Sequence, residues 1–318
     1  TVTSLNVAVG ARLFFRWNFN TTGSNSQGLG LDDFSLTAQV AVASAPEIAV
    51  SGNGANIADG DATPSTGDHT DFGDVLVDGG TLTRTYTITN SGNADLTLGT
   101  ATTSGTHAAD FIVTAQPATP VAPGGSTTLQ VQFNPSAVGT RSAEVSFTNN
   151  DSDENPFNFS IQGAGTSPEI AVSGNGNDIA DGDTTPDATD GTDYGNVLIG
   201  NNLDQTFVIT NTGNAALSLG VVTTSGTHAA EFAVITQPAS PLAVSNSTTF
   251  VVRFTPAGAG VRSASLSFTN SDSGENPFNF DIQGSGVSAA PNMILLGTNL
   301  ATIANGDTTP AAADGTDF

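Results

Sequence analysis

Cysteine and lysine are both absent from this sequence of 318 residues, and its six basic residues are all arginines. Without cysteine no disulfide framework can form. Without lysine, the chain has no donor for a lysine–asparagine isopeptide bond and no lysine acceptor for covalent pilus assembly. A rigid protein of this composition needs another source of stiffness, and a bound metal ion is the candidate that remains.

Positive charge is scarce: the chain has 6 basic residues and 30 acidic ones, which gives a formal net charge of −24. Such a field repels nucleic acid and anionic membrane surfaces, so we expect neither nucleic-acid binding nor membrane insertion. No signal peptide, membrane-spanning run or lipidation motif occurs, and we expect the chain to be a piece of a longer, exported protein. The acidic excess suits a medium that contains salt or calcium, although acidic residues also serve simply to solvate a surface.

Helical periodicity is missing as well, since no stretch combines a period of 3.6 residues with capping residues. Instead the chain has 36 glycines and 15 prolines among many Thr, Ser, Asn and Val residues, which favours short strands and frequent turns. Its 18 phenylalanines are enough for small hydrophobic cores. The sequence therefore predicts an all-β fold.

An internal repeat organises the chain. The sequence PEIAVSGNG begins at Pro46 and again at Pro168, and the repeat of about 120 residues is long enough for a whole domain. Turn signals at regular spacing predict β-sandwiches over 46–163 and 168–284 and the truncated start of a third copy over 291–318. In the first copy the predicted strands are 46–51, 74–77, 82–90, 95–103, 111–116, 126–134, 140–149 and 156–162.

Residues 1–43 differ from the repeats. Apolar and polar residues alternate over 13–19, as in a half-buried strand, and this segment is predicted to hold the C-terminal strands of a preceding β-sandwich. The run GLGLDDFSL at 28–36 resembles the ending of jelly-roll domains in large secreted bacterial proteins, some of which bind carbohydrate. Trp17 could stack on a sugar, but its place in the alternating run also fits core packing.

Two stretches of the first copy, with counterparts in the second, carry a more distinctive pattern. They read FGDVLVDGGTLTRTYTITNSGNADLTL (72–98) and VAPGGSTTLQVQFNPSAVGTRSAEVSFTNND (121–151). This pattern resembles the bacterial "choice-of-anchor D" repeat, which is related to the ASH (abnormal spindle, SPD-2, hydin) and major-sperm-protein domains. The resemblance implies tandem immunoglobulin-like sandwiches that act as structural or adhesive modules of exported proteins, with no catalytic residues.

An aspartate-rich loop recurs in each copy, as DGDATPSTGDHTDFG from Asp59, as DGDTTPDATDGTDYG from Asp181, and begun again at Asn305. Calcium favours six to eight oxygen ligands presented by a flexible, glycine-containing loop, and clustered carboxylates repel one another unless a cation offsets them. The alternative is that these aspartates serve only as turn and cap residues, since the spacing is not that of an EF-hand. The candidate calcium ligands are Asp59, Asp61, Asp68, Asp71, Asp181, Asp183, Asp187, Asp190, Asp193, Asp307, Asp314 and Asp317.

Other candidate groups favour structural interpretations. A second acidic group, Asp151, Asp153 and Glu154, precedes the last predicted strand, and it is interpreted as a hairpin turn because Asp153 has no acidic counterpart in the second copy. His107 and His228 lie in matching segments that predict one helical turn, and they are interpreted as packing or capping residues. No catalytic motif occurs, so we do not expect an enzyme.

Together these features predict an extracellular structural protein of a bacterial surface stalk, matrix or filament. Its sandwiches would be joined by short linkers at 163–167 and 284–290, stiffened by calcium, and assembled by strand complementation between subunits, with 291–318 as the donor. The expected partners are further copies of the chain, and a glycan is a second candidate. The alternative function is an accessory, spacer or glycan-binding region of a large secreted hydrolase or adhesin.

Overall fold

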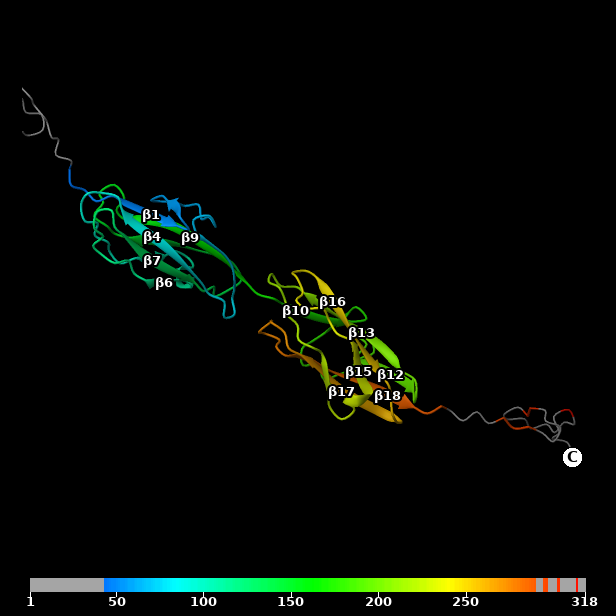
Figure 1. The fold of residues 1–318 in the computed structure, drawn as a ribbon. Coiled ribbons are helices and arrows are strands. Elements are labelled where there is room, and N and C mark those ends of the chain that lie inside the picture. Colours follow the sequence, from blue (N-terminus) through cyan, green and yellow to red (C-terminus); the bar gives the residue numbers. More distant parts are fainter. Residues whose placement is uncertain (1–42, 290–293, 297–301, 304–312, 314–318) are drawn as a thin grey trace, which may run out of the picture. The chain divides into compact units, whose positions relative to one another are not determined.

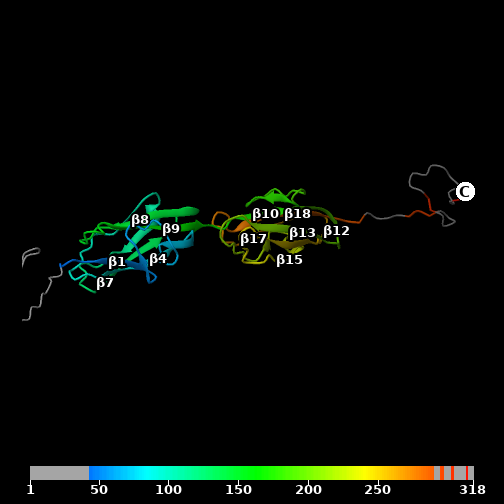
Figure 2. The same cartoon turned by 90° about the horizontal axis from the view of Figure 1, so that it is seen from above.

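The computed structural model describes residues 43–289, 294–296, 302–303 and 313. The predictions for residues 1–42, including Trp17, and most of those for 291–318 lie outside these ranges. Within residues 43–289 the chain forms two β-sandwiches, coloured blue to green and green to orange in Figures 1 and 2. Each sandwich is described by itself.

The first sandwich consists of two antiparallel-rich sheets that face each other. One sheet has the strand order β2-β1-β4-β7-β6 and the other has the order β3-β9-β8-β5, with β3 parallel to β9. The first sheet contains β1 (Ile48–Gly52), β2 (Ala55–Ile57), β4 (Leu82–Asn90), β6 (Phe111–Ala115) and β7 (Ser126–Phe133). The second contains β3 (Asp71–Leu76), β5 (Thr102–Ser104), β8 (Gly139–Phe147) and β9 (Phe157–Thr166), and the short 3-10 turn η1 (Ala108–Asp110) lies between β5 and β6.

The second sandwich repeats this topology element by element. Its sheets have the orders β11-β10-β13-β16-β15 and β12-β18-β17-β14, and β12 is again parallel to β18. The first contains β10 (Ile170–Gly174), β11 (Asn177–Ile179), β13 (Leu203–Asn211), β15 (Phe232–Thr236) and β16 (Ser247–Phe254). The second contains β12 (Asp193–Leu198), β14 (Thr223–Ser225), β17 (Gly260–Phe268) and β18 (Phe278–Val287), with η2 (Ala229–Glu231) after β14.

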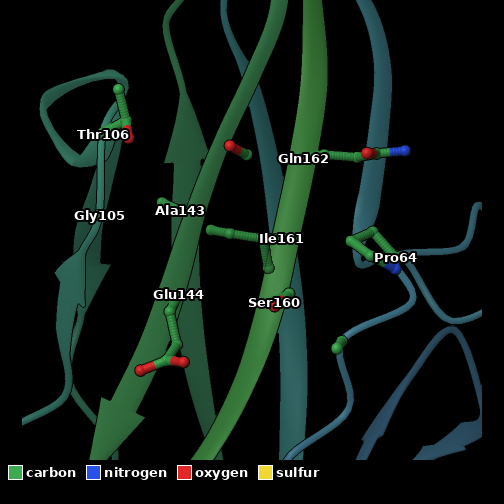
Figure 3. Close-up of a pocket in the computed structure, with 10 residues that line it drawn as sticks. Pro64, Gly105, Thr106, Ala143, Glu144, Ser160, Ile161 and Gln162 are labelled. Carbon is green, nitrogen blue, oxygen red and sulfur yellow. The ribbon is translucent and has the colours of Figure 1, made fainter.

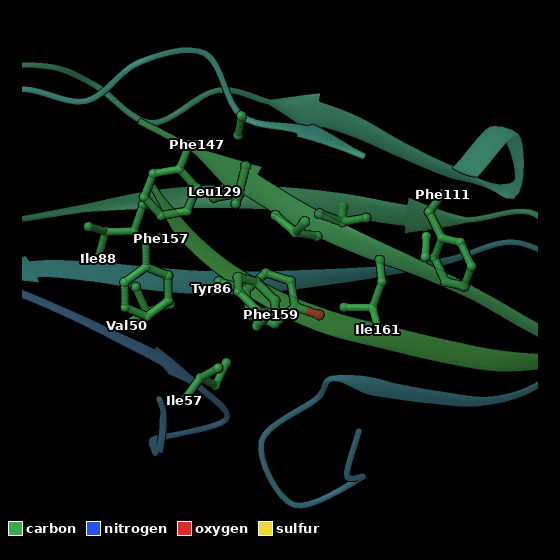
Figure 4. Close-up of a cluster of buried hydrophobic side chains, with 14 of the residues drawn as sticks. Val50, Ile57, Tyr86, Ile88, Phe111, Leu129, Phe147, Phe157, Phe159 and Ile161 are labelled. Atoms are coloured by element: carbon green, nitrogen blue, oxygen red, sulfur yellow. The ribbon is translucent and has the colours of Figure 1, made fainter. Parts of the chain in front are cut away.

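The core lies between the two sheets of each sandwich, where the period-two alternation predicted it. Val131 and Phe133 of β7 are fully buried, while Gln132 between them is half-buried. Phe111 stacks on Phe133 with ring centroids 4.6 Å apart, and Tyr86 meets Phe159 of the facing sheet edge-on at 5.1 Å (Figure 4). Aromatic side chains from both sheets therefore interlock, which is the main source of stability in a sandwich of this size.

The structure corrects several predicted boundaries. Residues 95–103 do not form a continuous strand: Leu96 and Leu98 pair singly with two different segments, and β5 begins only at Thr102. The short strand β2 was missed, although Asn53 and Gly54 both have left-handed backbone conformations, the geometry of a tight two-residue hairpin turn.

The predicted linkers turn out to be largely strand. β9 continues to Thr166 and β18 to Val287, so 163–166 and 284–287 belong to the sheets. A side chain at Gly163 would place its Cβ 2.5 Å from the ring of Phe133, so this glycine serves close packing rather than flexibility.

The last hydrogen-bonded residue of the first sandwich is adjacent in sequence to the first hydrogen-bonded residue of the second. Val77 donates its N–H to the carbonyl of Thr166, and Ser167 donates its N–H to Oδ1 of Asn214. A single peptide bond therefore connects Thr166 of the first sandwich to Ser167 of the second.

Candidate functional site

The aspartates of the first Asp-rich loop bind the backbone and hydroxyl groups of their own loop. Oδ1 of Asp61 accepts hydrogen bonds from the N–H and hydroxyl of Thr63, and Oδ1 of Asp68 accepts the same pair from Thr70. The hydrogen bonds from Thr63 lower the pKa of Asp61. Asp71 accepts a hydrogen bond from the N–H of Gly73, so these three residues act as turn-forming side chains.

The second loop repeats these contacts. The aspartate oxygens accept hydrogen bonds from backbone N–H groups two residues further along, at distances between 2.7 and 2.9 Å. The aspartates concerned are Asp183, Asp187, Asp190 and Asp193. Turn chemistry therefore accounts for these aspartates of both loops, with Asp59 and Asp181 as the exceptions. Calcium binding by these loops stays a prediction, and Asp307, Asp314 and Asp317 lie outside the described residues.

Each loop also lies along the edge of its own sheet. Asp59 accepts a hydrogen bond from the N–H of Asn158, Ser160 donates to the carbonyl of Asp61, and Gln162 donates its side-chain amide to Asp71. Asp181 makes the matching contact with the second sandwich, to the N–H of Asn279. The first loop therefore extends the β3-β9 edge of its sandwich.

The structure gathers acidic groups elsewhere, at the start of each copy. Among the described residues, two places bring three acidic side chains together so that one carboxylate oxygen of each lies within 4.8 Å of the others. We call them the first acidic triad (Glu47, Asp151 and Glu154) and the second acidic triad (Glu169, Asp272 and Glu275). The hairpin interpretation of Asp151 and Glu154 was thus incomplete, because a residue about one hundred positions earlier completes the group and Asp153 is not part of it.

Backbone hydrogen bonds hold the central aspartate of each triad. Asp151 is 3 % exposed, and its Oδ2 accepts a hydrogen bond of 2.8 Å from the N–H of Ile48, the first residue of β1. Its own N–H donates to Oδ1 of Asn149, whose amide in turn donates to the carbonyl of Glu154. Asp272 of the second triad receives the same contact from Ile170, at 3.0 Å. The triad therefore joins the start of β1 to the turn between β8 and β9.

Each triad also contains a glutamate, Glu154 or Glu275, whose carboxylate lies in an unfavourable electrostatic environment. Oε2 of Glu154 is buried and has no hydrogen-bond partner, and the same is true of Oε2 of Glu275. Burial raises the pKa of Glu154, and the negative charges of Asp151 and Glu47 raise it further. Burial, then Asp272 and Glu169, raise the pKa of Glu275 in the same order. A buried acceptor without a donor is costly unless a proton or a cation offsets it.

A buried asparagine holds the same N-terminal segment from the other side. Asn90 is fully buried; its amide donates to the carbonyls of Ala94 and Val121, and its Oδ1 accepts from the N–H groups of Glu47 and Gly92. Asn93 accepts a hydrogen bond from the N–H of Ala45. The TNSGN motif at 89–93, part of the stretch 72–98, therefore fastens the start of β1.

The matched histidines fasten the 3-10 turns. Nδ1 of His107 accepts a hydrogen bond of 3.0 Å from the N–H of Ser142 on β8, and His228 accepts the matching bond from Ser263 at 3.1 Å. Both imidazoles therefore serve as local structural acceptors, and neither lies in an acidic triad.

An open depression of about 370 Å³ lies on the β8-β9 face of the first sandwich (Figure 3). Glu144 and Gln162 are its largest polar lining residues, and small residues such as Ser160 complete it. Since the lining contains one carboxylate and no histidine, it offers neither a pair of acids nor a nucleophile with a base. The depression supports no catalytic assignment.

Comparison with protein families settles the fold family. The model of the HYDIN/CFA65/VesB-like Ig-like domain matches twice, over residues 65–164 and 188–285, which together make up more than half of the sequence. The chain belongs to this family. The match confirms the predicted ASH-like resemblance and the all-β fold of tandem immunoglobulin-like domains.

The solved structures that a comparison found share little sequence with this chain. They include a protein of unknown function from Porphyromonas gingivalis W83, 14 % identical, covering 64 % of this chain and 91 % of its own, with a TM-score of 0.28. The ASH/PapD-like domain 7 of human CEP192 is 13 % identical, with coverages of 31 % and 83 % and a TM-score of 0.26. The secreted serine protease VesC from Vibrio cholerae is 12 % identical, with coverages of 67 % and 48 % and a TM-score of 0.26.

A comparison with curated proteins found no match. Among the described residues, no helix has the length and apolar character needed to cross a membrane.

Proposed function

We propose that this chain is a non-catalytic structural segment of an exported bacterial protein, in which tandem Ig-like modules bear tension between the parts that they join. One observation carries the proposal: Thr166, which is hydrogen-bonded within the first sandwich, is followed directly by Ser167, which is hydrogen-bonded within the second. A force applied along the chain therefore reaches the second sandwich without first extending a linker. The repeated core and the fastened start of each module support the same role.

Single-molecule pulling tests this role. We expect two unfolding events of similar force, each lengthening the chain by roughly 40 nm, because about 120 residues extend by about 3.5 Å each. Early extension at low force before the first event would contradict the proposal, since it would indicate slack or unfolded modules.

Self-association into a filament on the cell surface is a further part of the proposal. Electron microscopy of the purified chain tests it: ordered fibres support a filament, and dispersed monomers favour the alternative of a spacer within a larger secreted hydrolase or adhesin. In that case the remainder of the gene should encode the catalytic or binding domain.

A further inference from the structure

The two acidic triads place like charges together, and the backbone N–H of Ile48 or Ile170 binds the central aspartate of each triad without reaching the buried Oε2 of its glutamate. In the first triad Glu47 is exposed and free to point into water, yet its carboxylate oxygen lies within 4.8 Å of those of Asp151 and Glu154. The exposed glutamate of the second triad, Glu169, does the same. Unscreened carboxylates repel at such distances, so a positive charge between them is the arrangement that accounts for their convergence.

A second observation is independent of the clustering. Oε2 of Glu154 and Oε2 of Glu275 are buried from solvent and find no donor in the protein. The central aspartate is itself almost completely buried, 3 % exposed in the first triad and 5 % in the second. Each triad thus contains a buried carboxylate oxygen that receives no hydrogen bond from the protein, and it does so at the same place in both copies.

The geometry points to a divalent cation bound by each acidic triad, and we propose calcium as the metal. Calcium binds oxygen at about 2.3–2.6 Å, so two oxygens on opposite sides of one ion are at most about 5 Å apart. All three oxygens of a triad fall within that span. The donors are oxygens alone, without the sulfur or imidazole nitrogen that zinc and copper prefer, and water reaches the exposed glutamate to complete the coordination.

The position of the ion specifies what it does. It ties the residue that precedes β1 to the turn between β8 and β9, two segments about one hundred residues apart in sequence. Loss of the ion therefore loosens the point at which the chain enters each sandwich. This inference does not depend on the proposed mechanical role, because binding is measured on the isolated chain.

Calcium titration of the whole 318-residue chain, after removal of metal with a chelator, tests the proposal by calorimetry. The matched variants are Glu47→Gln and Glu169→Gln, whose exposed side chains can be changed without disturbing the core. We expect each variant to bind one calcium ion fewer than the parent chain, and the double variant two fewer. Calcium should also raise the Tm of the parent by roughly 5 °C and that of the double variant much less.

Controls on the Asp-rich loops distinguish the two candidate places. Asp61→Asn and Asp183→Asn should leave the calcium stoichiometry unchanged. Loss of binding in these loop variants, with full binding in the triad variants, would overturn the proposal. So would an absence of calcium binding at millimolar concentration. If the chain bound no calcium and Glu154→Gln stabilised it at pH 7, the positive charge in the triad would be a shared proton.

Discussion

The two sandwiches have the same topology but place their single core tyrosine at different positions. In the first sandwich Tyr86 of β4 donates to the carbonyl of His69, and in the second Tyr194 of β12 donates to the carbonyl of Val252. Each position is occupied by phenylalanine in the other copy. The fold therefore requires a ring at both places, and a hydroxyl is accommodated wherever a backbone carbonyl lies within reach.

Charged side chains differ more between the copies than the core does. The first sandwich has a short ion pair of 2.6 Å between Arg141 and Asp110, while the equivalent pair of Arg262 and Glu231 is 3.7 Å apart. Glu231 accepts a hydrogen bond from the N–H of Ala257, as Asp110 does from that of Ser136 at the equivalent position. The comparison shows that the hydrophobic interior specifies the module, whereas its edges vary in the quality of their polar contacts. Matched substitutions in both copies can test this.

The largest effect should come from the stacked rings. Phe133→Ala and Phe254→Ala should each cost about 3–5 kcal/mol, because each removes a fully buried ring and leaves a cavity. Hydrogen exchange measured by mass spectrometry should show lost protection in the altered sandwich alone. Unequal losses would show that one copy relaxes around the cavity better than the other.

Removal of the buried asparagine should have the next largest effect. Asn90→Ala and Asn211→Ala should each cost about 2–4 kcal/mol, since several buried backbone groups lose their partners. Urea denaturation gives the stability, and protection of the segment before β1 or β10 should fall first. A cost close to zero would contradict the fastening role of the motif.

The ion pairs should differ in strength and pH dependence. Burial raises the pKa of Asp110, but the hydrogen bonds from Arg141 and Ser136, together with the positive charge of Arg141, outweigh burial, and the pKa is lowered. A carboxyl group whose folded pKa is lowered stabilises the fold above its unfolded pKa of about 3.9, and this contribution disappears as the pH falls through the folded pKa. Asp110→Asn should therefore cost about 1–3 kcal/mol at pH 7, and the cost should fall steadily as the pH is lowered below about 3.9.

Glu231→Gln is the matched comparison for this pair. It should cost less than Asp110→Asn at pH 7, because its ion pair is longer. Urea denaturation of both variants at pH 7 and at lower pH measures the difference. Equal costs would mean that the distance between the partners does not determine their contribution.

The smallest effect should come from exchanging one residue between the copies. Nε of Arg84 is buried without a partner, and the second sandwich has Gln205 at this position. Arg84→Gln should stabilise the first sandwich by about 1 kcal/mol or leave it unchanged, because it removes an unsatisfied group. The reverse change, Gln205→Arg, should destabilise the second sandwich, and thermal unfolding can compare them.

Much of the fold could be predicted because its signals are local. The alternation in β7 and in β8 identified buried faces, and the segment around His107 was predicted as a single helical turn, where the structure has η1. Predictions failed where a distant neighbour changes the meaning of a residue. Gly163 suggested a linker, but it lies in β9 beneath the ring of Phe133.

The candidate site shows the same division. The amino-acid sequence alone determined the Asp-rich turns, since aspartates such as Asp61 and Asp183 bind an N–H group two residues away, and it showed the repeat through the recurring motif. Only the tertiary structure decided that Glu47 meets Asp151 and Glu154, because strand pairing brings together residues about one hundred positions apart. Short-range hydrogen bonds leave a pattern in neighbouring letters, whereas contacts across a sandwich depend on how the sheets close.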